Sequence, residues 1–461
     1  MQTLIKNATI VTSHPARSVL HDAAIVIDDD VIAAIGSSMD LSKQFKDADV
    51  VDARDRAIFP GLVNCHTHLC LTAWRGIQED FGFPSTLTFP TSVRALMSDE
   101  ENAVFAMLGA LEAVRSGNTT LLELGRQTAT YAHILATSGL RLVLGEMVMD
   151  VQWEGVREGR FTHSPDLGDQ GLQRTADLFS RWHGGLDGRI TCFVGPYATE
   201  ACSPEFLQST RAFAEQHDTG YSIHQNQSLW EVEAVRKIRG LLPTEYLRQS
   251  DFLGPRLVGG HCRCMQPSEI ALMGQSGAFV SFNSAIAARR GASPPIQALE
   301  AAGCTIALGS DNMAEDMVEV MRTALFMERV ARRDALHLQP EDVLGWATQN
   351  GARALRLDEK VGSLEVGKQA DLFMVNARRP NLVPTLRIVS AFVHNGQAAD
   401  IESVMVRGQW VMRDGKVLTI DEADVVARAQ SIGLRVWHDL VAQYPNVPFP
   451  IRLPPREPLR A

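Results

Sequence analysis

The stretch PGLVNCHTH, residues 60–68, follows the apolar run 57–59 and places two histidines two positions apart. Alternate residues of a strand point the same way, so His66 and His68 should project to one side where a strand ends. Two imidazoles that converge in this way form half of a metal site. The pair alone also fits two loop histidines, so its meaning depends on the rest of the chain.

Three further segments have the same form, a β-rich run that ends in a potential metal ligand. Residues 221–223 lead into His224, residues 256–260 into His261, and residues 305–310 into Asp311. Helix-compatible sequence separates these segments. In alternating β/α folds the active site lies at the carboxyl ends of the strands. The set of residues therefore predicts a metal site there.

Composition limits the classes of function. The chain has 461 residues, of which 45% are hydrophobic and 21% charged, and its net charge is −10. A net negative charge provides no basic surface for nucleic acid or anionic lipid, so we expect neither nucleic acid nor a membrane as a partner. The seven cysteines are scattered and odd in number. Together with an N-terminus that lacks the features of a signal peptide, they predict reduced thiols and a cytoplasmic location.

The order of predicted elements divides the chain into three parts. Short strands fill residues 1–56 and recur in residues 366–420, where 371–375 and 388–389 are expected strands. We therefore expect a small β-sandwich domain built from both termini. Residues 57–365 alternate β and α about eight times, starting with a strand at 57–59, which predicts an α/β fold with a TIM-like (β/α)8 barrel. Residues 421–461 should form a helix, over 422–443, and a tail.

Several ordered motifs resemble the amidohydrolase superfamily. They are PGLVNCHTH at 60–68, LGSDN at 308–312, ATQNGARAL at 347–355 and GSLEVGKQADL at 362–372. The chain is similar to the branch that holds cytosine, guanine and S-adenosylhomocysteine deaminases and triazine chlorohydrolases. The resemblance covers nearly the whole length. It implies a metal-dependent hydrolase and, by analogy, a homo-oligomer.

The resemblance also implies roles for individual residues. The metal ligands of the family fall on His66, His68, His224 and Asp311, and His261 matches the histidine that polarises the substrate. Binuclear members use a carboxylated lysine, but no lysine occurs between positions 46 and 237. We therefore expect one divalent metal ion. Zinc is the first choice, and Fe2+, Co2+ and Mn2+ are compatible with histidine and carboxylate ligands.

One departure from the family affects the predicted reaction. Gln227 stands where the deaminases carry the glutamate that protonates a ring nitrogen. A glutamine can only hydrogen-bond, and the loss of a general acid costs roughly 10²- to 10⁴-fold in rate. We therefore predict hydrolysis of a C–N bond in a small neutral urea, carbamate or amide. Asp311 would take a proton from water and pass it to the leaving nitrogen, while Gln227 would donate an N–H bond.

Two alternatives remain open. The first is a heteroaromatic aminohydrolase or chlorohydrolase that acts on a purine-, pterin- or triazine-like ring, with another residue in place of the glutamate. Glu123 and Glu200 lie near predicted strand ends and are candidates, although each also fits a salt-paired carboxylate. The second, more remote alternative is an inactive metal-binding scaffold.

The substrate contacts are predicted from position. The segment after the first histidine pair is long and aromatic, from Trp74 to Phe89, and fits either a lid over a flat substrate or packing at the barrel mouth. Tyr197 follows a predicted strand, and Asn312 follows Asp311. The predicted substrate-binding residues are Gln227, Tyr197, Trp74 and Asn312.

Overall fold

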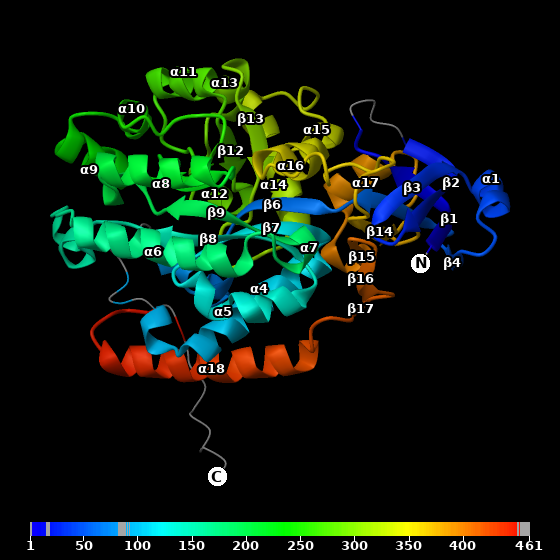
Figure 1. Cartoon of the computed structure of the whole chain (residues 1–461), viewed down its shortest axis with the longest axis horizontal. Helices are drawn as coiled ribbons and strands as arrows, with labels where there is room; N and C mark the ends of the chain where they lie inside the picture. Colours follow the sequence, from blue (N-terminus) through cyan, green and yellow to red (C-terminus); the bar gives the residue numbers. More distant parts are fainter. Residues whose placement is uncertain are drawn as a thin grey trace, which may run out of the picture.

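Eight parallel strands form a barrel in the computed structural model, which describes residues 2–14, 19–81, 89, 91, 93–449 and 451 (Figure 1). They lie in chain order, and a parallel bridge between Thr67 and Asp311 joins the first strand to the segment after the last. The predicted (β/α)8 architecture is therefore confirmed. The strands are β6 (Leu62–Thr67), β7 (Asn118–Gly125), β8 (Arg141–Val148), β9 (Ile190–Pro196), β10 (Tyr221–Gln225), β11 (Leu257–His261), β12 (Phe279–Phe282) and β13 (Thr305–Leu308).

Helices cover the outside of the barrel between successive strands (Figure 1). The strands are buried on both faces, as expected when helices cover a parallel sheet. The helices are α4 (Asp99–Arg115), α5 (Thr128–Leu135), α6 (Pro165–Trp182), α8 (Pro204–Gln216), α9 (Leu229–Arg239), α10 (Pro243–Gln249), α11 (Pro267–Ser276), α12 (Ser284–Arg289), α13 (Ile296–Ala301) and α14 (Met317–Arg332).

A second sheet combines strands from both ends of the chain beside the barrel (Figure 1). Its order is β17-β16-β15-β14-β5-β1-β2-β3, with β4 paired to β1, so the expected small domain from both termini is present. The strands are β1 (Gln2–Val11), β2 (Val19–Asp28), β3 (Val31–Ser37), β4 (Asp49–Asp52), β5 (Arg56–Pro60), β14 (Leu372–Asn376), β15 (Ile401–Val406), β16 (Gln409–Arg413) and β17 (Lys416–Val417).

A buried ion pair fastens this sheet to the barrel. Arg141 of β8 donates from Nε and Nη2 to the two carboxylate oxygens of Asp371, at 3.0 and 2.9 Å. Both side chains are almost completely buried. Such bidentate pairs fix orientation as well as distance. The pair therefore holds the segment before β14 in register with the barrel.

Two predicted strands are corrected. Residues 57–59 are not the first barrel strand; they lie in β5, where Phe59 stacks on Phe373 of β14 at 5.1 Å between ring centroids. The chain turns at Gly61, where a Cβ atom would collide with Thr119, and the barrel begins only at β6. Residues 388–389 are not a strand either; they begin α17 (Ile388–Asn395). A short apolar run fits a buried helix as well as a strand.

The structure contains the helix predicted over 422–443. Helix α4 begins with a capping box between Ser98 and Glu101. The terminal helix α18 (Glu422–Gln443) packs along α4 on the outside of the barrel (Figure 1). Residues 452–461 of the expected tail lie outside the described residues, as does Phe83 of the expected lid. Within the described ranges, no helix has the length and apolar character needed to cross a bilayer.

Candidate active site

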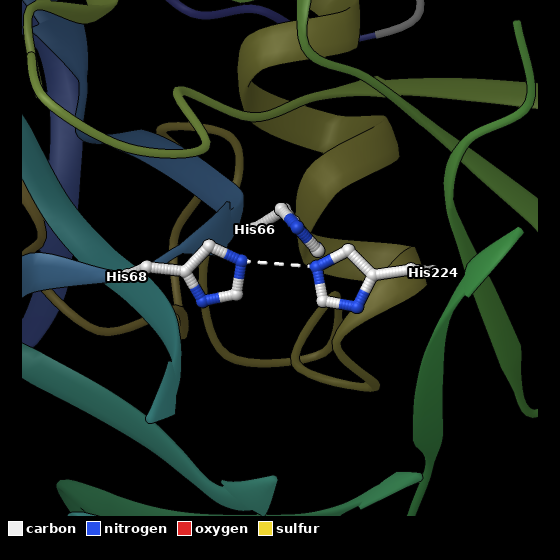
Figure 2. A group of neighbouring side chains, drawn as sticks. All are labelled: His66, His68 and His224. Carbon is white, nitrogen blue, oxygen red and sulfur yellow. Dashed lines mark hydrogen bonds between the residues drawn. The ribbon is translucent and has the colours of Figure 1, made fainter. Parts of the chain in front are cut away.

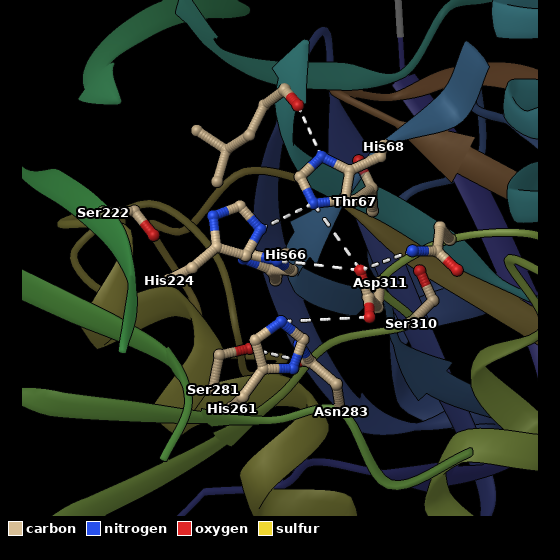
Figure 3. Close-up of polar contacts among 12 residues, drawn as sticks. His66, Thr67, His68, Ser222, His224, His261, Ser281, Asn283, Ser310 and Asp311 are labelled. Carbon is tan, nitrogen blue, oxygen red and sulfur yellow. Dashed lines mark hydrogen bonds and ion pairs between the residues drawn. The ribbon is translucent and has the colours of Figure 1, made fainter. Parts of the chain in front are cut away.

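The five predicted residues meet at the carboxyl end of the barrel (Figure 3). His66 and His68 come from the end of β6, His224 from β10, His261 from β11, and Asp311 follows β13. All five are buried. The ligand atoms of His66, His68 and His224 lie within 4.8 Å of one another, and so do those of His66, His261 and Asp311. The structure therefore brings together residues that are up to 245 positions apart.

Two of the three histidines drawn in Figure 2, His68 and His224, are oriented by main-chain carbonyls. Nδ1 of His68 lies 2.5 Å from the carbonyl oxygen of Leu124, and Nδ1 of His224 lies 2.6 Å from that of Tyr197. A carbonyl only accepts, so each Nδ1 carries the proton and each Nε2 carries a lone pair. These two Nε2 atoms are 3.1 Å apart. Two lone pairs at this distance repel each other unless they share a cation.

His66 completes the cluster with two buried ring nitrogens that have no hydrogen-bond partner among the described residues. Burial is the main cause that lowers the pKa of His66 well below its usual value, and the neighbouring His68 and His224 lower it further. Burial likewise lowers the pKa of His224 to about 3. These two imidazoles are therefore neutral near pH 7, as metal ligands must be. The donor set fits a divalent metal bound by three imidazoles and the carboxylate of Asp311.

Backbone geometry holds Asp311 against the histidines. The main-chain N–H of His68 donates to the carbonyl oxygen of Asp311 at 2.8 Å. The main-chain N–H of Asp311 donates to the carbonyl oxygen of His66 at 2.9 Å. The Asp311 Oδ1 lies 3.5 Å from Nε2 of His68 and accepts a bond from the Asn312 amide at 3.1 Å. Asp311 and His261 both have left-handed φ angles, of 73° and 76°. Such strain costs roughly 1–3 kcal/mol per residue and is common at functional sites.

A cavity of about 200 Å³ opens above this cluster. All four predicted substrate contacts line it, namely Gln227, Tyr197, Trp74 and Asn312. Among the described residues, aromatic rings form much of its wall: Trp74 stacks on Phe89 at 4.7 Å, and Trp153 meets Tyr197 edge-on at 5.5 Å. This wall suits a flat ligand.

Two wall residues were not predicted from sequence. Arg126 covers both Trp153 and Tyr197, with its guanidinium carbon 4.7 and 5.2 Å from their ring centroids. Arg126 directly follows β7, so its place at the carboxyl end of a strand was a usable signal. Trp153 begins a short helix, η4 (Trp153–Glu158), that no sequence pattern indicated.

The two glutamates considered as replacement acids differ in position. Glu123 lines the cavity, but its carboxylate already accepts hydrogen bonds from Thr67, Leu69 and Tyr131 at 2.7–3.0 Å. Glu200 is not among the described residues that line the cavity. Burial, and next the charge of Glu231, raise the pKa of Glu200 well above its usual value. Glu123 is therefore engaged in hydrogen bonds, and Glu200 lies outside the described lining of the cavity.

Glu231 instead supports the loop that carries Gln227. Its two carboxylate oxygens accept bonds from the main-chain N–H groups of Asn226 and Gln227, at 2.9 and 2.6 Å, and from the Thr199 hydroxyl at 2.5 Å. Glu231 therefore fixes the backbone of Gln227, whose side chain lines the cavity. The site therefore places the neutral amide of Gln227 in the same cavity as the metal-ligand cluster.

Comparison with known proteins identifies relatives across nearly the whole chain. Relatives include a 5'-deoxyadenosine deaminase of Methanothermobacter thermautotrophicus, 32% identical, with 88% of this chain and 93% of the relative covered. A 5-methylthioadenosine/S-adenosylhomocysteine deaminase of Syntrophobacter fumaroxidans is 31% identical, with coverages of 93% and 97%. A zinc-bound adenosine deaminase structure from Xanthomonas campestris superposes with a TM-score of 0.85 at 26% identity, with coverages of 95% and 98%.

The family match covers most of the same sequence. The Amidohydrolase family matches residues 57–411, which include all five clustered residues and the wall of the cavity. With relatives at 31% and 32% identity over nearly their full length, the chain belongs to the amidohydrolase family and is a metal-dependent hydrolase of carbon–nitrogen bonds other than peptide bonds.

Proposed function

We propose that this enzyme removes an amino group from a heteroaromatic ring, with adenine nucleosides as the first substrate class to test. The observation that carries the proposal is the cluster of buried imidazoles that opens onto a cavity walled by aromatic rings. The names of the relatives support it, because they are deaminases of adenosine derivatives. Deamination of a heteroaromatic ring was the alternative that the sequence left open. The names of the relatives favour it over hydrolysis of a linear C–N bond.

Each residue of the site has a defined task in this proposal. A divalent metal, for which we propose zinc, would be held by His66, His68, His224 and Asp311 and would make water acidic enough to act as a nucleophile near neutral pH. Asp311 takes the proton of that water and returns it to the leaving amine.

The remaining residues bind and orient the ring. His261 faces Asp311 across the reaction space, with Nε2 3.9 Å from Oδ2, and hydrogen-bonds the atom that gains negative charge. Gln227 donates its amide N–H to a ring nitrogen and does not protonate it. The rings of Tyr197 and Trp153 stack against the substrate.

Gln227 favours a second candidate function, hydrolysis of a urea, carbamate or amide. The tetrahedral intermediate of such a substrate collapses without prior protonation of a ring, so a neutral amide donor at position 227 is sufficient. The two candidates differ in the product: the first releases ammonia from a ring, and the second releases an amine from a carbonyl carbon.

One comparison of substrates separates the candidates. Zinc-loaded protein would be given adenosine, 5'-deoxyadenosine and S-adenosylhomocysteine in one panel, and aryl ureas and carbamates in the other. We expect ammonia release from the first panel, with the ultraviolet spectrum changing from adenine to hypoxanthine. Amine release from the second panel alone would contradict the first proposal and support the second. Protein carrying Asp311→Asn gives the background for both assays.

A further inference from the structure

The fourth imidazole of the site, His261, differs from the others in what surrounds its Nδ1. Nδ1 of His68 and of His224 faces a carbonyl oxygen. Nδ1 of His261 instead faces two nitrogens, Nη2 of Arg263 at 3.4 Å and Nδ2 of Asn283 at 3.2 Å. Figure 3 shows the ring between Asn283 and Asp311.

Arg263 decides which nitrogen of His261 carries the proton. An asparagine amide can be turned over, and Ser281, 2.8 Å from Asn283 Oδ1, can donate or accept, so this pair alone fits either tautomer. A guanidinium has donors only. Because Arg263 donates to Nδ1, that atom must hold a lone pair, and the proton of the neutral ring must be on Nε2.

The local backbone explains why this arginine reaches back. His261 and Cys262 have consecutive left-handed φ angles of 76° and 53°, which curl the chain directly after β11. The N–H groups of Cys262 and Cys264 then donate to the carbonyls of Gln225 and Asn226, at 2.9 and 2.8 Å. The curl leaves Arg263 only 7% exposed. Arg263 is therefore buried within hydrogen-bond reach of His261.

We propose that Arg263, supported by Asn283, holds His261 in the tautomer that carries its proton on Nε2, so that His261 donates a hydrogen bond into the reaction space. Since that nitrogen then has no lone pair, His261 is not a metal ligand. The set of imidazole ligands is limited to His66, His68 and His224. Arg263 is a positioning residue, because it acts through His261. The inference depends on the metal-hydrolase chemistry of this site but not on which substrate the site takes.

Nuclear magnetic resonance tests the tautomer without any substrate. Zinc-loaded protein with 15N-labelled histidine would be recorded in long-range 1H–15N correlation spectra, and His261 would be assigned by the loss of its signals in His261→Gln. We expect a neutral ring with the proton on Nε2 only. A proton on Nδ1 in the wild-type protein would overturn the proposal. Because no turnover is measured, this outcome is independent of whether the proposed aminohydrolase activity is found.

Two substitutions then test the part played by Arg263. In Arg263→Met the donor is lost and Asn283 is free to turn over, so we expect a second His261 population with the proton on Nδ1. In Arg263→Lys a donor remains, and we expect the wild-type pattern. A single His261 population with the proton on Nε2 in Arg263→Met would show that Arg263 does not set the tautomer.

A matched pair elsewhere in the chain provides the control. Arg329 places Nη1 3.5 Å from Nε2 of His394, outside the described lining of the cavity. Arg329→Met should change the signals of His394 and leave those of His261 as they are. A change at His261 in this variant would show that the spectra respond to stability in general, which would contradict a specific role for Arg263.

Discussion

The two sides of the active-site cavity are built in different ways. On the metal side, His66 and His224 lie in barrel strands, His68 directly follows one, and main-chain carbonyls set the tautomers of His68 and His224. On the substrate side, Trp153 and Gln227 lie on segments outside the strands. The first side is fixed by the hydrogen-bonded ladder of the barrel, whereas the second depends on local packing.

This difference separates reaction type from specificity. Strand ends in a barrel are held within a common framework, so the same chemistry can persist while the connecting segments change the substrate. Tyr197 belongs to both sides, since its carbonyl accepts from His224 and its ring lines the cavity. Substitutions on the metal side should therefore reduce turnover of every substrate. Substitutions on the substrate side should change which substrate is preferred.

The largest effect is expected on the metal side, for Asp311→Asn. The amide cannot take a proton from water, so kcat should fall by roughly 10²- to 10⁴-fold on every substrate. The three imidazoles remain, and zinc content measured by elemental analysis should stay near one ion per chain. Wild-type turnover with zinc still bound would contradict the role given to Asp311.

The next effect is expected at the boundary between the two sides, for Gln227→Glu. If the substrate is an amino-substituted ring, a general acid at this position should raise kcat by up to about 10²-fold. If the substrate is a urea or carbamate, loss of the amide donor should lower it. The initial rate on each substrate panel measures the direction.

A charge control is available on a neighbouring helix. Gln249→Glu makes the same chemical change at an exposed position at the end of α10. It should leave both rates unchanged. A rate change of equal size in Gln249→Glu would mean that net charge, and not the position of the acid, is responsible.

The sequence predicts the metal side well for a physical reason. His66, His224 and Asp311 each end a β-rich run, and parallel strands of a barrel must bring those ends together. The run 57–59 belongs to the small sheet and not to the barrel, because its apolar residues fit either sheet and their pattern does not choose between the two. Trp153 could not be predicted, since nothing local relates a short helix to a distant cavity.

A smaller effect is expected from the aromatic wall, for Trp153→Leu. Loss of the ring contact with Tyr197 and Arg126 should raise KM by about 2- to 10-fold, the size of a typical aromatic pair, with kcat little changed. Trp410, which has Arg413 5.4 Å from its ring centroid in the second sheet, is the matched control. Trp410→Leu should leave KM as it is, and an equal rise there would argue against a wall that binds substrate.

The smallest effect concerns the pH dependence of the protein's stability. It arises from Glu200 and Glu231, which are both buried near the substrate side of the cavity. Burial raises the pKa of Glu231 to about 7, and burial with the charge of Glu231 raises that of Glu200 well above its usual value. Below pH 4.5 the unfolded chain also holds these protons. As pH rises toward 7 the unfolded chain releases them first, so the free energy of unfolding falls by up to about 1.4 kcal/mol per pH unit for each carboxyl.

Glu200→Gln removes one of these carboxyls, so the melting temperature should fall less between pH 5 and pH 7 than in the wild-type protein. Calorimetry at the two pH values measures the difference, and the exposed Glu359→Gln should behave as wild type. An unchanged pH dependence in Glu200→Gln would mean that Glu200 is ionised in the folded protein.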